Sequence, residues 1–404
     1  MVVSPSFLLY NKVLYTIFLR NKRNDHVMKR AYLDNSATTP VCRQAADKAY
    51  EMMTACWGNP SSLHTAGFEA EQELEAARRT VAGLLGAAPE TITFTSGGTE
   101  ANNLAVLGAA AAKKRAGRHI ITTAMEHPSV AAACGALEKE GWEITRLTPD
   151  ASGCVSAAAL EAALRPDTVL VSMMMVNNET GAIFPVEEAA PLIRRLAPGA
   201  LLHCDAVQAF GKLPIRTSRL DVDMLTVSGH KIHAPKGCGA LYVKKGVRIL
   251  PRAFGGGQEK GLRPGTEATP AIAAFGAAAD AVPELNAQRI RFESLMDRLL
   301  SGLKKQEGII VHRPTRHAPY ILNLSVSGIR SETLLHFLAQ REIYVSSGSA
   351  CSRGKSSPVL AALGLPPAEI DSAVRVSFSR DNDEEDIDRF LTGLEEARAS
   401  LARR

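Results

Sequence analysis

The sequence predicts an α/β fold with a largely parallel central sheet and a smaller second unit. From about residue 30 onward, short β-branched segments alternate with stretches rich in Ala, Glu, Leu and Arg that have a helical period. Such alternation is typical of parallel α/β sheets, in which each helix returns the chain to the start of the next strand. The chain of 404 residues is also longer than one typical domain. A hydrophobic content of 46% with 22% charged residues excludes general disorder.

Seven strands are expected in the first part of the chain, at residues 91–95, 119–123, 143–147, 168–176, 201–204, 224–227 and 240–243. A Gly-rich stretch at 255–266 predicts a loop, after which the composition is strongly helical to about residue 306. Three further strands are expected, at 320–326, 343–345 and 373–378. We therefore predict a large domain at 44–267, and a small α+β domain formed by 29–43 together with 268–404.

Residues 1–28 are expected to lie outside the fold as a leader or extension. Within residues 1–30 six basic residues stand against Asp25 alone, whereas the rest of the chain has 41 basic and 41 acidic residues. The formal charge of +5 therefore reflects this leader, and the sequence favours neither nucleic-acid nor membrane binding. The apolar runs of the leader are too short and interrupted to span a bilayer. A transit peptide and a translated segment upstream of a start at Met28 both stay open.

The cysteines and histidines give no disulfide or metal signature. The seven cysteines include no C-x-x-C pair and are odd in number, which favours reduced thiols in a cytoplasmic protein. His203, Cys204 and Asp205 are adjacent potential metal ligands, but successive residues of a strand point to opposite faces and cannot close one site. We predict a cytoplasmic location and no metal centre.

A strand, a Gly turn and a helix start follow one another at residues 91–104, where 96–100 have the sequence Ser-Gly-Gly-Thr-Glu. Backbone N–H groups around Gly98 can approach a phosphate, the helix dipole favours its charge, and the Thr99 hydroxyl adds a hydrogen bond. The segment matches neither the P-loop nor the dinucleotide fingerprint. Taken alone, it is equally consistent with a capped helix after a tight turn.

Two residues that follow neighbouring strands make this prediction more specific. Lys231 comes just after the strand at 224–227, and a lysine that is desolvated there and close to other cations can form a Schiff base with an aldehyde. Asp205 closes the strand at 201–204, where a carboxylate can keep a pyridine nitrogen protonated. A phosphate cradle, a Schiff-base lysine and a pyridinium partner together specify pyridoxal 5'-phosphate.

Five motifs occur in order between about residues 29 and 380. They are 32–40 (Tyr-Leu-Asp-Asn-Ser-Ala-Thr-Thr-Pro), 95–100 (Thr-Ser-Gly-Gly-Thr-Glu), 176–181 (Val-Asn-Asn-Glu-Thr-Gly), 228–231 (Ser-Gly-His-Lys) and 346–351 (Ser-Ser-Gly-Ser-Ala-Cys). Together these motifs resemble those of the cysteine desulfurases of the NifS/IscS type, and the last separates that group from aminotransferases of the same fold. The resemblance implies a fold-type I pyridoxal-phosphate transferase that converts L-cysteine to L-alanine.

The resemblance also implies roles at the matching positions. Lys231 would hold the cofactor and move the Cα proton, His127 would stack on the pyridine ring, and Asp205 would pair with the ring nitrogen. Without its motif, His127 would be interpreted as a loop histidine with its hydrogen bonds satisfied. Further cofactor contacts would come from Gly98, Thr99, Asn178, Gln208, Ser228 and His230.

Substrate and subunit contacts follow from the same resemblance. Arg375 would hold the carboxylate of L-cysteine through its planar fork, helped by Asn35 and Asn178. Thr266 matches a threonine that the family brings to the phosphate from the partner subunit. A homodimer is therefore expected.

Cys351 lies in a Ser- and Gly-rich stretch that predicts a mobile loop, and Arg353 and Lys355 favour its thiolate. The resemblance implies that this thiolate takes the substrate sulfur as a persulfide. The acceptor would be an iron–sulfur scaffold or a tRNA- or cofactor-thiolation enzyme, with Cys351 also a transient ligand of the cluster. Ser352 and Arg353 replace the Thr-Ser pair common in the housekeeping type, so the acceptor stays open.

Two alternatives remain at this stage. A selenocysteine or cysteine lyase would use the same cofactor but would not need Cys351 for turnover. A catalytically silent assembly partner would be free to lose its site residues, yet the sequence retains Lys231, His127, Asp205, Arg375 and Cys351.

Overall fold

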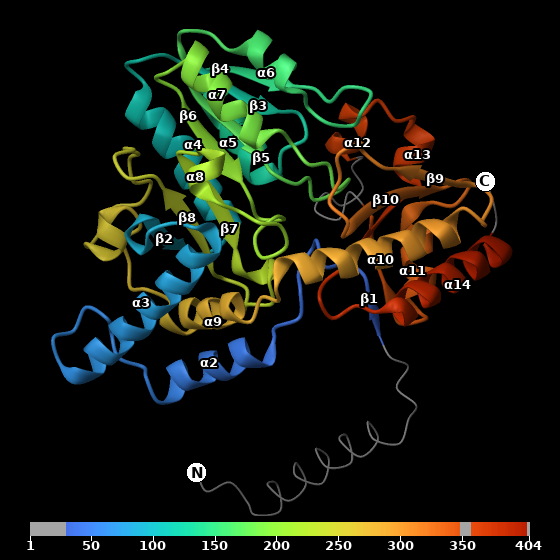
Figure 1. Cartoon of the computed structure of the whole chain (residues 1–404), viewed down its shortest axis with the longest axis horizontal. Coiled ribbons are helices and arrows are strands. Elements are labelled where there is room, and N and C mark those ends of the chain that lie inside the picture. Colours follow the sequence, from blue (N-terminus) through green and yellow to red (C-terminus); the bar gives the residue numbers. More distant parts are fainter. Residues whose placement is uncertain (1–29, 348–356, 402–404) are drawn as a thin grey trace, which may run out of the picture.

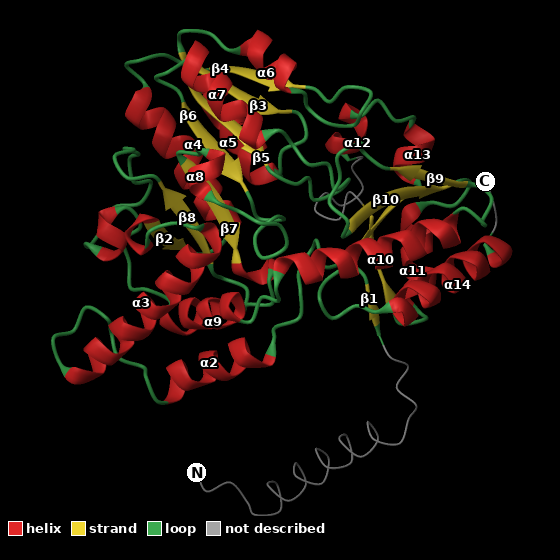
Figure 2. Cartoon of the chain, in the orientation of Figure 1, coloured by secondary structure: helices red, strands yellow, loops and turns green. Residues whose placement is uncertain are grey.

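The computed structural model describes residues 30–347 and 357–401 (Figure 1). A large sheet with its helices forms one end of the molecule, and a smaller sheet with its own helices forms the other (Figure 2). The predicted α/β class is confirmed. The predicted leader and Cys351 lie outside the described residues.

The large sheet has the strand order β2-β8-β7-β6-β5-β3-β4. β8 runs antiparallel to both of its neighbours, and the remaining paired strands from β7 to β4 are parallel. β5, β6 and β7 are buried along their whole length, as is typical of strands that are covered on both faces. All seven strands expected in this part of the sequence are present, namely β2 (Ile92–Thr95), β3 (His119–Thr123), β4 (Glu143–Leu147), β5 (Thr168–Met174), β6 (Leu201–Asp205), β7 (Met224–Ser228) and β8 (Gly239–Val243).

Helices that follow these strands cover the sheet. α4 packs across the central strands β5 to β8, and α5 packs against α4. α4 begins three residues after β2 ends and α5 begins five residues after β3 ends, which gathers loop residues at the carboxyl edge of the sheet. The helices of this region are α4 (Gly98–Lys113), α5 (Pro128–Lys139), α6 (Ala157–Ala163), α7 (Val186–Leu196) and α8 (Thr217–Leu220), with short 3-10 turns η1 (Pro89–Thr91), η2 (Gly229–Lys231) and η3 (Gln258–Gly261).

A layer of three helices, α2 (Arg43–Thr54), α3 (Thr65–Leu85) and α9 (Thr269–Asp280), lies beside the large sheet (Figure 1). α9 packs on both α2 and α3. At the α9–α3 contact, a Cβ placed on Gly276 would lie 2.6 Å from the Cα of Ala77. The predicted domain division at 267/268 stays a prediction. α9 follows this division in the chain but packs on α2 and α3, beside the large sheet.

The smaller region is built on an antiparallel sheet of order β12-β13-β10-β9, beside a two-stranded pair of β1 and β11. β9 was not expected from the sequence, because it is a partly exposed edge strand. The strands are β1 (Ala31–Tyr32), β9 (Ile309–His312), β10 (Ile321–Val326), β11 (Ile343–Tyr344), β12 (Ser346–Ser347) and β13 (Ala373–Ser377). The helices are α10 (Leu285–Leu303), α11 (Ser331–Ala339), α12 (Pro358–Ala362), α13 (Pro367–Asp371) and α14 (Glu384–Ser400).

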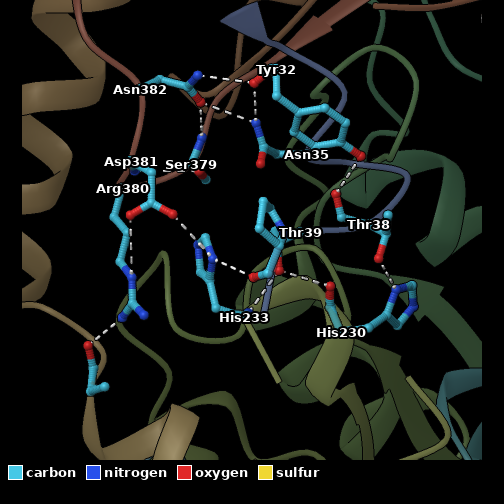
Figure 3. Close-up of polar contacts among 12 residues, drawn as sticks. Tyr32, Asn35, Thr38, Thr39, His230, His233, Ser379, Arg380, Asp381 and Asn382 are labelled. Atoms are coloured by element: carbon cyan, nitrogen blue, oxygen red, sulfur yellow. Dashed lines mark hydrogen bonds and ion pairs between the residues drawn. The ribbon is translucent and has the colours of Figure 1, made fainter. Parts of the chain in front are cut away.

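The segment that follows β1 connects the two regions (Figure 3). On one side, the side chain of Asn382 donates to the carbonyl of Tyr32 at 2.9 Å. On the other, the Thr39 hydroxyl donates to the carbonyl of His230 at 3.0 Å and accepts the backbone N–H of His233 at 2.8 Å. The N-terminal segment is therefore fixed against the loop that carries Lys231.

No helix within residues 30–347 and 357–401 is long and apolar enough to cross a membrane. The six cysteines of the same residues are free thiols, and four of them are buried. Burial raises the pKa of Cys134 to about 12, so this thiol is unreactive at neutral pH.

The close contact at Gly276 gives a test of the helix layer. In an open helical position, replacing Gly by Ala stabilises by about 0.5–1 kcal/mol. At Gly276 the added methyl meets backbone atoms, and overpacking costs roughly 1–3 kcal/mol, so Gly276→Ala is expected to lower the midpoint of urea unfolding. Gly135→Ala in α5 is the matched control, because a Cβ there meets nothing within 4 Å, and its midpoint is expected to rise. Equal shifts in both variants would contradict this packing.

Candidate active site

The predicted phosphate cradle lies at the carboxyl edge of the large sheet. Gly97 precedes α4 with a φ of 149°, a conformation that favours glycine. A Cβ on Gly98 would lie 2.9 Å from the side chain of Val207, so only glycine fits there without movement. The first N–H groups of α4 have no partners within the helix, and the side chain of Thr99 in this turn is exposed. This end of α4 can therefore receive an anion.

Ser228 and His230 lie beside this cradle. The Cβ of Ser228 is 3.6 Å from the Cβ position of Gly98. Ser228 is buried at the end of β7, and its Oγ has no hydrogen-bond partner among the described residues. His230 follows in η2, and burial, together with Lys231, lowers its pKa to about 4. The unpaired hydroxyl of Ser228 thus borders the helix start, whereas Nδ1 of the neutral His230 ring lies 3.2 Å from the hydroxyl oxygen of Thr38.

Lys231 ends η2, and its Nζ donates to the carbonyls of Ser36 at 2.5 Å and Ala37 at 2.7 Å. A second lysine, Lys212, lines the same small pocket. Lys212 is buried, its Nζ has no hydrogen-bond acceptor within the described residues, and it lies 4.9 Å above the ring of Tyr320. Burial, and then repulsion by Lys231, lowers the pKa of Lys212 to about 7. The predicted Schiff-base lysine therefore has a buried cationic neighbour.

Asp205 lies at the end of β6, with 5% of its surface exposed. Its Oδ1 accepts the N–H of Val207 at 3.0 Å, and its Oδ2 accepts an amide hydrogen of Asn102 at 2.7 Å. His203 is bonded instead to hydroxyl groups of the two neighbouring strands. Burial lowers the pKa of His203 to about 3. Asp205 and His203 therefore have different hydrogen-bond partners and share none of them.

His127 caps the N-terminus of α5, where its Nδ1 accepts the backbone N–H of Ser129 at 3.2 Å. Burial lowers the pKa of this imidazole, Asp205 opposes that effect, and Lys231 adds to it. The side chains of Asp205 and Lys231 therefore both lie within electrostatic reach of the histidine. The three residues predicted to act on the cofactor ring are brought together by three different strand ends.

Gln208 and Asn35 have part of their hydrogen bonding satisfied by the chain. Gln208 Nε2 donates to the carbonyl of Ser36 at 3.0 Å, while its Oε1 has no partner among the described residues. The Nδ2 of Asn35 contacts the carbonyls of Tyr32 and Ser377 and the side chain of Asn382. These contacts hold Asn35 against the smaller region, and its predicted contact with substrate stays a prediction.

Arg375 lies on β13 with 5% of its side chain exposed. Its Nη1 donates to the carbonyl of Asn178 at 2.9 Å, and its Nη2 pairs with Asp34 at 2.6 Å. Its Nε is buried without a hydrogen-bond partner in the described part of the chain. Asp34 and Asn178 therefore fix one end of the guanidinium, and the other end keeps a donor for a carboxylate.

The residues on either side of Cys351 that the structure describes are both attached near Arg375. Ser346 in β12 pairs directly with Arg375 in β13. After Cys351, the next described residue is Ser357, whose hydroxyl donates to the carboxyl group of Glu179 at 2.5 Å. Burial raises the pKa of Glu179 to about 7.

Comparisons with known proteins agree with this geometry. The aminotransferase class-V family matches residues 31–390. The cysteine desulfurase IscS of Serratia proteamaculans (strain 568) is 43% identical over 366 residues, which cover 88% of this chain and 90% of that protein. The chain belongs to the cysteine desulfurases of the NifS/IscS type.

Solved structures of desulfurase-like proteins support the same assignment. A NifS-like protein superposes with a TM-score of 0.87 at 37% identity, covering 92% of this desulfurase and 100% of that chain. SspA, solved in complex with cysteine, has a TM-score of 0.77 at 34% identity, with 87% and 99% of the two chains covered. The enzyme depends on pyridoxal 5'-phosphate, and the predicted cofactor is therefore confirmed.

The residues of this desulfurase fit that cofactor. Lys231 would supply the amine for covalent attachment, and the carboxylate of Asp205 would supply a partner for the ring nitrogen. The buried Oγ of Ser228 and the buried Oε1 of Gln208 have no partner among the described residues, and a bound cofactor gives such atoms one. The uncovered N–H groups at the start of α4 fit its phosphate.

Several contacts of the desulfurase site were missed in the sequence although the residues lie in or near the quoted motifs. Asp34, which pairs with Arg375, and Glu179, which bonds Ser357, stand inside two of them. Asn102, which bonds Asp205, lies one helical turn after Gly98, and that spacing places the two on one face of α4. The helical period thus indicates that Asn102 lies on the face of α4 that carries Gly98. The pairing of Asp34 with Arg375 has no such signal in the local sequence.

Glu126 precedes His127 and is a buried acid of this site. Its Oε1 accepts the hydroxyl of Thr123 at 2.8 Å and the N–H of Met174 at 2.9 Å. Its Oε2 has no hydrogen-bond partner within the described residues. Burial is the main cause that raises the pKa of Glu126 to about 8.

This raised pKa predicts a pH-dependent contribution to stability. The folded protein keeps the Glu126 proton up to about pH 8, whereas the unfolded chain releases it near the ordinary glutamate pKa of 4.5, so stability falls as pH rises through this window. Glu126→Gln removes this titration. The difference in free energy of unfolding, Glu126→Gln minus native protein, is expected to increase by on the order of 1–3 kcal/mol from about pH 5.5 to pH 8. Urea unfolding at both pH values measures the difference, and a pH-independent difference would contradict it. The exposed Glu395→Gln is the control.

Proposed function

We propose that this desulfurase takes the sulfur of L-cysteine onto Cys351 as a persulfide, releases L-alanine, and passes the sulfur to an acceptor protein. The observation that carries the proposal is the buried Arg375, whose Nη1 bonds the carbonyl of Asn178 and whose Nε has no partner among the described residues. A buried guanidinium with a free donor fits the carboxylate of an amino acid.

The proposed reaction assigns each step to residues of the chain. The bound cofactor supplies the electron sink that makes the Cα–H and Cβ–S bonds of the substrate breakable. Lys231 moves the Cα proton, Asp205 holds the ring nitrogen protonated, and His127 stacks on the ring and shuttles a proton. The Ser228 hydroxyl, His230 and the start of α4 at Gly98 and Thr99 hold the phosphate.

Sulfur transfer then involves the Cys351 thiolate. This thiolate bonds to the substrate sulfur, the Cβ–S bond breaks, and the three-carbon product gains a proton at Cβ to leave as alanine. Ser346 and Ser357 support this proposal, because both are attached close to Arg375, with Cys351 five and six residues away along the chain. A chain of that length reaches at most about 20 Å when extended, which limits how far the thiol can lie from the substrate site.

The acceptor is proposed to be an iron–sulfur scaffold or a tRNA- or cofactor-thiolation enzyme, and Cys351 a transient ligand of the cluster. We also propose that the reaction takes place in the cytoplasm. The free state of the six described cysteines agrees with a reducing compartment.

A homodimer completes the proposal, with Thr266 contributed to the partner's phosphate site. Thr266 is exposed on its own subunit. Large apolar side chains are exposed on and between α2 and α3, including Trp57 at 70%, Leu63 at 105% and Phe68 at 58%. An exposed apolar surface of this kind marks a protein contact, and a second copy of the chain is the proposed occupant.

The persulfide step is tested with Cys351→Ala. Alanine formation from L-cysteine with a thiol reductant is expected to fall by roughly 100-fold or more, because no other thiolate takes the sulfur. The absorbance band at about 400 nm from the lysine-bound cofactor is expected to persist in this variant and to be lost in Lys231→Ala. Cys42→Ala is the matched control and should keep full activity. Alanine formation that survives Cys351→Ala would favour a selenocysteine or cysteine lyase instead.

The shared site is tested by mixing subunits. Thr266→Val alone is expected to weaken cofactor retention, because the phosphate loses a hydroxyl donor. A hybrid of a Lys231→Ala subunit and a Thr266→Val subunit has one site with both native residues if Thr266 acts across the interface. Unfolding and refolding the two together is therefore expected to restore activity above that of either parent. A hybrid without restored activity, alongside an active native dimer treated in the same way, would place Thr266 in its own subunit's site.

A further inference from the structure

A chain of hydrogen bonds joins Asp205 to His127 through two residues without a role in the proposed reaction. Asn102 Nδ2 contacts Oδ2 of Asp205 at 2.7 Å and Oγ of Ser129 at 2.8 Å. The same Oγ lies 2.7 Å from Nδ1 of His127. Asn102 and Ser129 are 1% and 6% exposed, so water does not compete for these bonds. The four residues come from α4, β6 and the start of α5.

The direction of each hydrogen bond follows from the chemistry of the groups. A carboxylate only accepts, so the amide nitrogen of Asn102, and not its oxygen, must face Asp205. The second hydrogen of that nitrogen is then donated to Ser129. The Ser129 oxygen accepts it and has one hydrogen left to donate.

The backbone decides where that hydrogen goes. Pro128 occupies the first position of α5 and has no N–H, so the N–H of Ser129 is the one that His127 caps, at 3.2 Å. A hydrogen on Nδ1 of His127 would face this N–H, and the contact would be repulsive. Nδ1 is therefore an acceptor, the Ser129 hydroxyl donates to it, and the ring hydrogen is on Nε2.

We propose that Asn102 and Ser129 are positioning residues that hold His127 as its Nε2–H tautomer and connect its orientation to the carboxylate of Asp205. The inference rests on the roles given to His127 and Asp205 in the proposed function. It deepens that function by assigning the ring proton of His127 to Nε2, so that Nε2 is the nitrogen with a proton to donate.

The surrounding charges agree with a neutral ring. Burial and Lys231 favour the neutral imidazole, and Asp205 opposes them. Protonating Nδ1 would in addition break both hydrogen bonds that it accepts. The hydrogen-bond chain from Asp205 through Asn102 and Ser129, which we call the relay, and the burial of His127 therefore both favour the neutral ring.

The test is the tautomer of His127 in the cofactor-loaded dimer, read from the nitrogen shifts of ¹⁵N-histidine protein, with the His127 signals assigned by their loss in His127→Gln. The native enzyme is expected to show a protonated Nε2 and an unprotonated Nδ1. In Ser129→Ala the tautomers are expected to mix, and the apparent pKa of His127 to rise by about half a unit to one unit, because a hydrogen bond to the neutral form is lost. Ser156→Ala, which removes a helix-capping hydroxyl from α6, is the control and should change neither. A native ring protonated at Nδ1, or an unchanged spectrum in Ser129→Ala, would overturn the proposal.

A second variant tests the order of the relay. Asn102→Ala removes a contact of Asp205 as well as the hydrogen bond to Ser129. It is expected to change both the His127 tautomer and the pH dependence of the cofactor band at about 400 nm, whereas Ser129→Ala changes the tautomer alone. Identical effects of the two variants on the band would contradict the relay. Absence of alanine formation by the native enzyme would reject the proposed function instead, whatever the tautomer.

Discussion

The active site depends on the segment between Asp34 and Thr39, which is held between the two regions of the molecule. The Ser36 carbonyl accepts from Lys231 at 2.5 Å and from Gln208 at 3.0 Å. Asp34 pairs with Arg375 across a sequence separation of 341 residues. A buried carbonyl or carboxylate without a partner is costly, so the segment, the lysine and the arginine must be placed together. The site therefore forms only when the N-terminal segment has docked against both sheets.

Around this segment, the site gathers three basic side chains close to its acids. Lys231 and Arg375 both lie within electrostatic reach of Lys212, and burial together with these two cations lowers the pKa of Lys212 to about 7. Asp34 engages one end of Arg375, and Asp205 is bonded by Asn102 and a backbone N–H. The Nζ of Lys212 and the Nε of Arg375 have no hydrogen-bond partner among the described residues, and such donors are complementary to an anionic ligand.

The site also contains buried polar atoms without partners in the described residues, among them Ser228 Oγ, Gln208 Oε1 and Arg375 Nε. Each such atom costs on the order of 1–3 kcal/mol when left unpaired. Other buried groups of the site are paired, since Nδ2 of Asn102 bonds both Asp205 and Ser129. At the site, these unpaired donors and acceptors therefore lie where a ligand can supply the missing partner, next to bonds that are already made.

The sequence by itself determined the class of fold, the strands of the large sheet and the family, because burial imposes a period on local sequence and the chemistry of the motifs is local. It also determined that Lys231, Asp205 and Gly98 follow strand ends of one sheet, since parallel strands end at one edge. Tertiary structure alone decided the pairing of Asp34 with Arg375, the partly exposed strand β9, and the packing of α9 on α2 and α3. These features depend on contacts between segments far apart in the chain, for which neither residue type nor local period carries a signal.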